Sequence, residues 1–135
     1  MYGLRNLEIV CDLSPERASQ RATDLGFSRY SADWQDVVND DSVDLISICT
    51  PNDTHAEIAI AALNAGKHVW CEKPMSTNLA DSAAMVAAAK ISTGKTIVGY
   101  NYTKNPAVTH ARRLIESGVI GDVAGFFCRY DVDNE

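Results

Sequence analysis

Short apolar runs alternate with longer segments of helical periodicity along this chain, and this alternation limits the folds open to it. The apolar runs cover residues 7–11, 43–50, 68–71 and 96–102, with a brief extra run at 27–31. The helical segments between them cover residues 12–26, 32–40, 51–66, 78–94 and 105–118. Strands that are apolar along their whole length are typical of a parallel sheet covered on both faces by helices. The sequence therefore predicts an α/β fold with a doubly wound, Rossmann-like parallel sheet.

Several helix ends carry recognisable signals. Ser14 is suited to cap the first helix, Pro15 to occupy its first position and Gly26 to end it. Asp53 or Thr54 is expected to cap the helix that ends at Gly66.

Composition excludes several classes of function. The chain has 135 residues and a net charge of −6, and 46% of its residues are hydrophobic. That length suits one domain, and the acidic balance argues against nucleic acid or an anionic membrane surface as a partner. No apolar run reaches the roughly 20 residues of a membrane span, and the N-terminus does not resemble a signal peptide. We therefore expect a cytoplasmic location and no membrane partner.

The four cysteines, Cys11, Cys49, Cys71 and Cys128, are widely spaced. This spacing offers no local metal-binding or redox pair, so the expectation is buried, reduced thiols and no metal site.

Polar residues follow the apolar runs. Asp12 follows the run at residues 7–11, and "TPND" lies at the end of the run at 43–50. "EKP" follows the run at 68–71, and "GYNY" lies at the end of the run at 96–102. Ligands of open parallel sheets bind outside the carboxyl ends of the strands, so these residues are expected along one ligand edge. An acid placed like Asp12 binds ribose hydroxyls in dinucleotide-binding domains, but for this residue taken alone an ordinary loop or cap aspartate is the better fit. His55, in the first turn of a helix, is likewise open to a purely structural reading.

The tripeptide Glu72-Lys73-Pro74 places charges at the end of a strand expected to be buried. A lysine there is costly to desolvate unless it has an anionic partner or a function, and burial lowers the pKa of a lysine toward neutrality. A base or acid of that kind can transfer a proton, and Pro74 can adopt the cis form.

The stretch "VDLISICTPNDTHAEIAIAALNAGKHVWCEKPMSTNLADS", with "VCDLSPERA" before it and "GYNYTKNPAVTHARRLIESGVIGDVAGF" after it, resembles the Gfo/Idh/MocA family of oxidoreductases. The resemblance implies an NAD(P)-dependent oxidoreductase that acts on sugars, inositols or related polyols. NAD is expected to be preferred over NADP, because an Asp12 carboxylate at the ribose would repel the extra phosphate of NADP. It implies that Lys73 is catalytic. It also implies that the following residues bind or surround the cofactor: Asp12, Thr50, Pro51, Asn52, His55, Glu72, Lys73, Pro74, Tyr100 and Asn101.

Two parts of the family pattern are not found in the sequence. A glycine-rich phosphate loop is expected before residues 7–11, and most of a second, substrate-binding domain is expected after the sheet. We therefore expect a partial dinucleotide-binding domain over residues 1–118 and the beginning of a second α+β domain, with a further strand from residue 122, over residues 119–135. An in-frame strand and Gly-x-Gly-x-x-Gly pattern encoded upstream of Met1 would identify the chain as such a fragment.

In the family's strand order the first, central strand is the one without a counterpart here. The slot is expected to be filled, either by pairing of two chains in a homo-oligomer or by direct closure of residues 7–11 onto residues 45–50. The functional prediction is a fragment of a dehydrogenase that is inactive alone. The alternatives are a non-catalytic remnant or binding module of the same ancestry and, less well matched, an unrelated nucleotide-binding protein.

Overall fold

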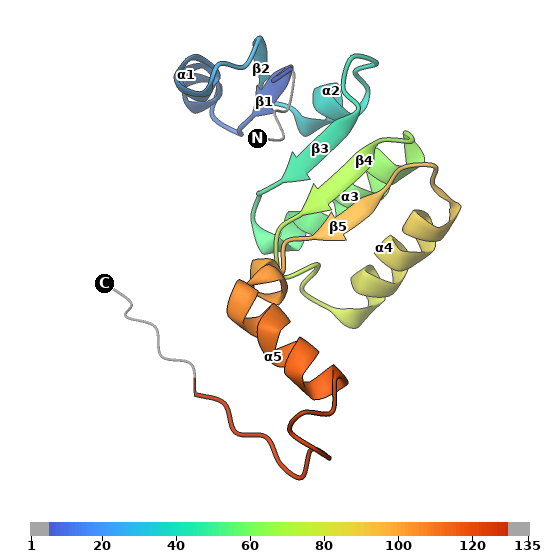
Figure 1. Cartoon of the computed structure of the whole chain (residues 1–135). Helices are drawn as coiled ribbons and strands as arrows, with labels where there is room; N and C mark the ends of the chain where they lie inside the picture. The colour runs from blue at the N-terminus through green and yellow to red at the C-terminus, as the bar shows by residue number, and fades with distance from the viewer. Residues whose placement is uncertain (1–5, 130–135) are drawn as a thin grey trace. The chain divides into compact units, whose positions relative to one another are not determined.

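The structure is a computed structural model and describes residues 6–129. Its strands are β1 (Ile9–Cys11), β2 (Arg29–Ser31), β3 (Leu45–Ile48), β4 (His68–Cys71) and β5 (Thr96–Val98) (Figure 1). Its helices are α1 (Pro15–Leu25), α2 (Trp34–Val38), α3 (His55–Asn64), α4 (Leu79–Ile91) and α5 (Pro106–Glu116). Two short 3₁₀ turns, η1 (Asn52–Thr54) and η2 (Asn101–Lys104), precede α3 and α5. The predicted alternation of strands and helices is confirmed up to α5.

Helix α1 begins and ends where its sequence signals predict. The Ser14 hydroxyl accepts the backbone N–H of Arg17 at 3.3 Å, and Pro15 occupies the first helical position. Gly26 adopts a left-handed conformation with φ of 79°, which costs glycine little, and so ends the helix. Helix α3 is different, because Thr54 precedes it without making a side-chain capping bond. No helix within residues 6–129 is long and apolar enough to cross a membrane.

All observed strand pairs are parallel, as predicted, but the strands form two separate sheets. One sheet contains β1 and β2, and the other has the order β3-β4-β5. The predicted direct closure of the first strand onto the third is therefore wrong for the described residues, because β1 pairs only with β2 and β3 only with β4. The two sheets are joined through packing, since Ile9 and Cys11 contact the hydrophobic core that lies around β3 and β4.

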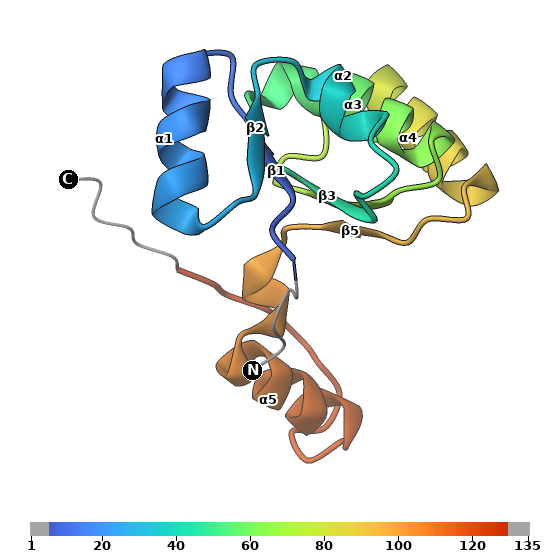
Figure 2. The same cartoon turned by 90° about the horizontal axis from the view of Figure 1, so that it is seen from above.

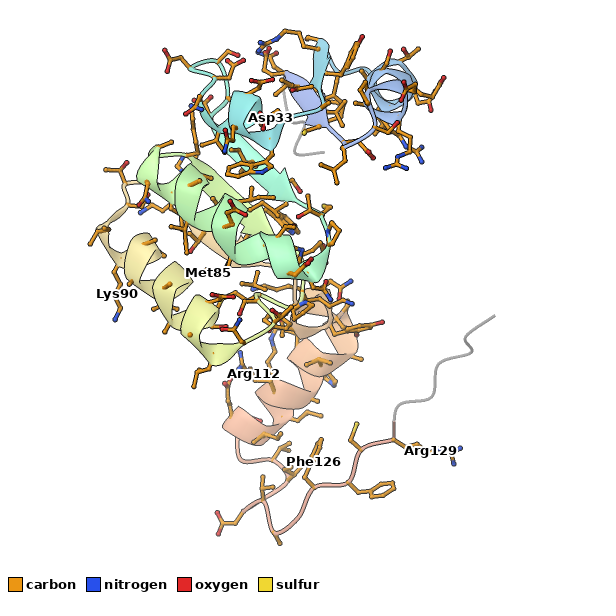
Figure 3. All side chains as sticks on the ribbon, turned by 180° about the vertical axis from the view of Figure 1, so that it is seen from behind. Asp33, Met85, Lys90, Arg112, Phe126 and Arg129 are labelled. Carbon is orange, nitrogen blue, oxygen red and sulfur yellow. The ribbon has the colours of Figure 1, made fainter. Side chains whose placement is uncertain are left out.

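Among the described residues up to Gly99, helices cover one face of the sheet β3-β4-β5. Helices α3 and α4 lie on the same side of it in Figures 1 and 2, and the buried core residues Ile46, Ile48 and Val69 belong to this sheet. Figure 3, seen from behind, has α3 and α4 in front of the strands and Met85 of α4 among them. On the opposite face Leu45, Trp70 and Ile97 are 44%, 44% and 50% exposed. Within the unit that ends at Gly99 the structure thus shows one covered face, and coverage of the second face stays a prediction.

The chain separates into two compact units at Gly99, with the second starting at Tyr100. The predicted domain boundary at residues 118/119 is a different division of the chain and stays a prediction. Residues 122–129 form no strand, so the predicted final strand is wrong over this stretch, and residues 130–133 lie outside the described part. A strand is stable only beside a partner, and residues 122–129 pair with none of the described strands.

The cysteines differ in their surroundings. Cys71 is buried and Cys11 partly buried, and burial is the main cause that raises the pKa of each thiol. Cys49 and Cys128 are exposed, so the prediction that all four are buried is wrong for these two. All four are free thiols.

Candidate functional site

Two polar loops lie side by side at the carboxyl edge of the sheet β3-β4-β5. Ile48 and Cys71, the last residues of β3 and β4, are in register, and the Glu72 N–H donates to the Ile48 carbonyl at 2.9 Å. The loop that contains Thr50, Pro51 and Asn52 therefore begins beside the loop Glu72-Lys73-Pro74. Except for Glu72, which is half-buried, all these loop residues are exposed. The structure brings these predicted site residues to one edge, as the sequence indicated.

The buried ring of His55 contacts one backbone carbonyl in each of the two loops and so connects them. It is 1% exposed, its Nδ1 lies 2.8 Å from the Pro74 carbonyl, and its Nε2 lies 2.9 Å from the Thr50 carbonyl. Both partners are backbone carbonyls, which can only accept hydrogen bonds, so the ring is the donor in any hydrogen bond with them. Neither ring nitrogen is available for a further partner, which makes His55 a positioning residue of this edge. Its predicted direct contact with a cofactor stays untested.

Lys73 is exposed, and its ammonium makes no hydrogen bond or ion pair with the rest of residues 6–129. The expectation of a lysine desolvated by a buried strand is therefore wrong, because β4 ends at Cys71 and the chain leaves the core before Lys73. The peptide bond between Lys73 and Pro74 is cis. Lys73 is distinguished by its position at the carboxyl edge of the sheet. Its charged group is exposed to solvent and has no partner among the described side chains.

Glu72 lies against the backbone at the end of β5. A Cβ atom placed on Gly99 would lie 2.8 Å from a carboxylate oxygen of Glu72, closer than real Cβ atoms approach. Glycine at residue 99 therefore leaves the space that the Glu72 carboxylate occupies. The same carboxylate accepts the Lys73 N–H at 3.3 Å, so it lies directly beside the candidate catalytic residue.

Asp12, at the end of β1, is held by an arginine that the sequence analysis did not include in the site. Arg17 donates to both Asp12 carboxylate oxygens, Nη2 at 2.7 Å and Nε at 3.1 Å, and the Ser14 N–H adds a bond of 2.9 Å. These bonds, with Arg17 as the larger cause, hold the pKa of the Asp12 carboxyl below its ordinary value. Helical side chains point back toward the helix N-terminus, so an arginine one turn into α1 is placed to reach the residue before it. The place of Arg17 in the first turn of α1 was therefore the sequence signal that its side chain could contact Asp12.

Asp12 and Thr50 also border the same cleft. A cavity of about 820 Å³ runs between β1 and β3, and it reaches Asp12 and Arg17 on one side and Thr50 and Pro51 on the other. The carboxyl ends of β1 and β3 thus face a common space, with an acid–arginine pair on one wall and a polar turn on the other.

Tyr100 and Asn101 are the first two residues of the second unit. The Tyr100 carbonyl accepts the Thr103 hydroxyl at 2.7 Å, and Asn101 begins η2. Both are exposed. Their predicted nearness to Lys73 and a cofactor stays a prediction.

A parallel α/β sheet with an acid after its first strand and polar loops along its carboxyl edge defines the class of dinucleotide-binding domains. Residues 3–100 match the oxidoreductase family with an NAD-binding Rossmann fold. The chain belongs to this family, Gfo/Idh/MocA, as its resemblance implied.

Characterised relatives support this membership. A levoglucosan dehydrogenase of Pseudarthrobacter phenanthrenivorans is 40% identical over 119 residues, which cover 88% of this chain and 30% of that protein. A myo-inositol 2-dehydrogenase of Thermotoga maritima is 31% identical, over 85% of this chain and 34% of that protein. Levoglucosan dehydrogenase in complex with NADH and levoglucosan superposes with a TM-score of 0.82 at 40% identity, covering 86% of this chain and 31% of that one. The chain thus spans about a third of the length of these relatives.

Proposed function

We propose that this chain is the cofactor-binding domain of an NAD-dependent dehydrogenase that acts on a hydroxyl carbon of a sugar, inositol or related polyol. The observation that carries the proposal is the edge described above, where His55 holds the Thr50 loop and the Lys73 loop together. It is supported by family membership and by relatives whose names specify levoglucosan and myo-inositol. Because the chain spans only about a third of those relatives, we propose activity for a complete enzyme and inactivity for this chain alone.

The cofactor would lie along the carboxyl edge. Asp12 would accept hydrogen bonds from the adenosine ribose, as acids at this place do in Rossmann folds. Thr50, Pro51 and Asn52 would line the groove, with His55 holding their loop from beneath. Glu72, Lys73 and Pro74 would surround the nicotinamide end, with Tyr100 and Asn101 close to the substrate.

Selection of NAD over NADP would depend on the pair of Asp12 and Arg17. A carboxylate at the ribose repels the extra phosphate of NADP, whereas an arginine near the ribose can accommodate it. Arg17 is bound to Asp12 through 2.7 Å and 3.1 Å contacts, so its charge is engaged by the carboxylate. We therefore propose NAD as the preferred cofactor.

Lys73 would act on the substrate hydroxyl. A bound nicotinamide supplies the hydride acceptor, while the protein supplies position and charge. The Lys73 ammonium, without a competing partner in residues 6–129, can stabilise the negative charge that develops on the hydroxyl oxygen as its proton leaves.

A second candidate function is a non-catalytic binding module. The open cleft between β1 and β3 favours it for the chain as it stands, because the sheet is interrupted where a dinucleotide would be bound. In such a module Lys73 would have no chemical role. We further propose residues 119–135 as the start of a substrate domain, a cytoplasmic location and a homo-oligomeric complete enzyme.

Steady-state kinetics on the complete enzyme separate these functions. Lys73→Ala is expected to lower kcat by about 10²-fold or more, the effect typical of removing one positioned electrostatic or proton-transfer group. Lys90→Ala, at an exposed lysine in the last turn of α4, is the matched control and should leave kcat unchanged. Measured with both cofactors, the wild-type enzyme should have the higher kcat/KM with NAD.

Three results would contradict the proposal. Near-normal kcat in Lys73→Ala would remove the catalytic role of this lysine. Equal use of NAD and NADP would mean that Arg17, or a residue of the phosphate loop, and not Asp12, determines the choice of cofactor. NAD reduction by the 135-residue chain alone with inositol or a common hexose would contradict its proposed inactivity.

A further inference from the structure

Gly99 and Glu72 lie opposite each other, one residue beyond the ends of β5 and β4. Cys71 and Val98, the last residues of these strands, are in register, and the Gly99 N–H donates to the Cys71 carbonyl at 2.8 Å. The parallel ladder therefore continues by one step past both strands. This step brings Gly99 to the carboxyl edge, where Glu72 begins the loop that contains Lys73.

The backbone conformation of Gly99 does not require glycine. Outside the region of positive φ, the backbone of any L residue is free to take the same path. Gly99 is not one of the described glycines with positive φ, which are Gly26, Gly66, Gly118 and Gly121. The need for glycine at residue 99 therefore comes from the space beside it.

A Cβ atom on Gly99 would meet the end of the Glu72 side chain. Its three nearest atoms would be the two carboxylate oxygens, at 2.8 and 3.1 Å, and the carboxylate carbon at 3.0 Å. Gly94 is the contrast, because a Cβ atom there would collide with the backbone carbonyl of Lys67. Backbone inside a fold yields little, whereas the end of a glutamate side chain can rotate away. A side chain at residue 99 would therefore displace the Glu72 carboxylate and leave the strand ends in place.

The place of the Glu72 carboxylate affects the backbone of Lys73. Its Oε2 accepts the Lys73 N–H at 3.3 Å, and this is the only hydrogen bond of the carboxylate within residues 6–129. None of the ion pairs in that part of the chain includes Glu72. No cation fixes the carboxylate there, so it depends on the room beside Gly99 to stay at the Lys73 N–H.

We propose that Gly99 is a positioning residue for Lys73. The lack of a side chain at residue 99 lets the Glu72 carboxylate bind the Lys73 N–H, and this contact orients the lysine at the carboxyl edge. The catalytic part of the inference rests on the proposed function, in which Lys73 acts on the substrate hydroxyl. A misplacement of about 1 Å can lower a rate by about 10²-fold, so a change at the neighbouring strand end can reduce kcat.

A double-mutant cycle in the 135-residue chain tests the positioning without any cofactor. The variants are Gly99→Ala, Glu72→Asp, whose carboxylate is shorter, and the two together. The readout is the Lys73 amide signal in ¹⁵N NMR, that is, its proton shift and its exchange rate with water. Gly99→Ala is expected to move the signal upfield and to speed exchange by about 3-fold or more, because the amide loses its acceptor.

In the Glu72→Asp background the same Gly99→Ala change should alter the exchange rate by less than about 1.5-fold, because no carboxylate is left to displace. Gly125→Ala is the matched control and should leave the Lys73 signal unchanged. A Cβ atom at Gly125 would have nothing within 4 Å, and its φ is not positive either.

The same cycle in the complete enzyme tests the catalytic part. Gly99→Ala is expected to lower kcat by about 10-fold in the wild-type background and by less than about 2-fold in the Glu72→Asp background. A glycine that only stabilises the fold would lower kcat by equal factors in both backgrounds.

Equal effects of Gly99→Ala in the two backgrounds would overturn the proposal, and so would an unchanged Lys73 signal or an unchanged kcat. Lys73→Ala in the same assay reports on the proposed function by itself. If Lys73→Ala is nearly inactive and Gly99→Ala keeps full kcat, the proposed function stands and the inference is wrong. If Lys73→Ala keeps near-normal kcat, the catalytic part is wrong together with the proposed function, and the NMR cycle alone decides whether Gly99 places the carboxylate.

Discussion

At the scale of single residues, the backbone oxygens of Thr50 and Pro74 converge on the buried ring of His55. The ring holds two loops that come from different strands, with contacts of 2.9 Å and 2.8 Å. Sequence placed His55 at the start of a helix but could not reveal this role, because Pro74 lies 19 residues away and joins it only in the folded chain. Arg17 shows the opposite case, since its neighbour Asp12 is local and helix geometry alone points toward it.

Replacing His55 by alanine is expected to destabilise the protein. The change removes the ring contacts to the Thr50 and Pro74 carbonyls and opens a cavity at a residue that is 1% exposed. We expect the free energy of unfolding to fall by about 2 kcal/mol or more, measured by urea denaturation. His110→Ala, at an exposed residue of α5, is the control and should change it by less than about 0.5 kcal/mol. Equal stability of wild type and His55→Ala would show that the ring does not hold the loops.

At the scale of elements, an ionic cluster joins the two sheets at their amino edge. Arg29 of β2 donates to the Asp40 carboxylate at 2.6 Å, and Lys67, just before β4, donates to the Asp40 carbonyl at 2.7 Å. Asp40 follows α2, so the cluster connects the β1–β2 sheet to the segments that lead into β3 and β4. The cluster lies at the edge opposite Asp12, Thr50 and Lys73.

The stability contribution of Asp40 is expected to disappear in acid. Arg29, and after it Ser42, hold the pKa of the Asp40 carboxyl well below its ordinary value of 3.8. The unfolded chain therefore binds a proton before the folded one, so the stabilisation is complete above about pH 5 and is lost as the pH falls below about 4. The measurement is the difference in free energy of unfolding between wild type and Asp40→Asn, which should shrink between pH 5 and the acid limit of folding.

Asp41→Asn, at the exposed neighbouring residue, is the matched control and should follow the wild-type pH profile. A difference between wild type and Asp40→Asn that stays constant with pH would mean that the Asp40 contacts do not contribute through charge.

The elements themselves could largely be predicted from sequence, because their signals are local. Apolar runs located β1, β3 and β4, and Ser14, Pro15 and Gly26 set the ends of α1. The strand expected from residue 122 failed for a physical reason. Alternation shows that a segment can pair, but pairing needs a neighbour, and residues 122–129 have none in the described sheets.

At the scale of the whole molecule, the residues up to Gly99 form an NAD-binding family domain whose sheet is divided in two. The family resemblance predicted where the sheet is divided, between β1 and β3. It did not predict whether these two strands would pair or leave a cleft. Whether β1 closes onto β3 or leaves a cleft depends on packing against α2 and the core, which sequence periodicity does not report. The observed cleft of about 820 Å³ keeps Asp12 and Thr50 on opposite walls of one space.

The central claim is that the carboxyl edge of β1, β3 and β4 binds a nicotinamide dinucleotide. The most direct measurement is an NMR titration of the ¹⁵N-labelled chain with NADH, followed residue by residue. With the sheet divided, we expect weak binding with a Kd of about 1 mM, equivalent to about 4 kcal/mol. Amide shifts should concentrate at Asp12, Thr50, Asn52, Glu72 and Lys73, and the amino-edge residues Asp40 and Lys67 should stay unchanged. Absence of shifts at millimolar NADH, or shifts centred on the amino edge, would contradict the account.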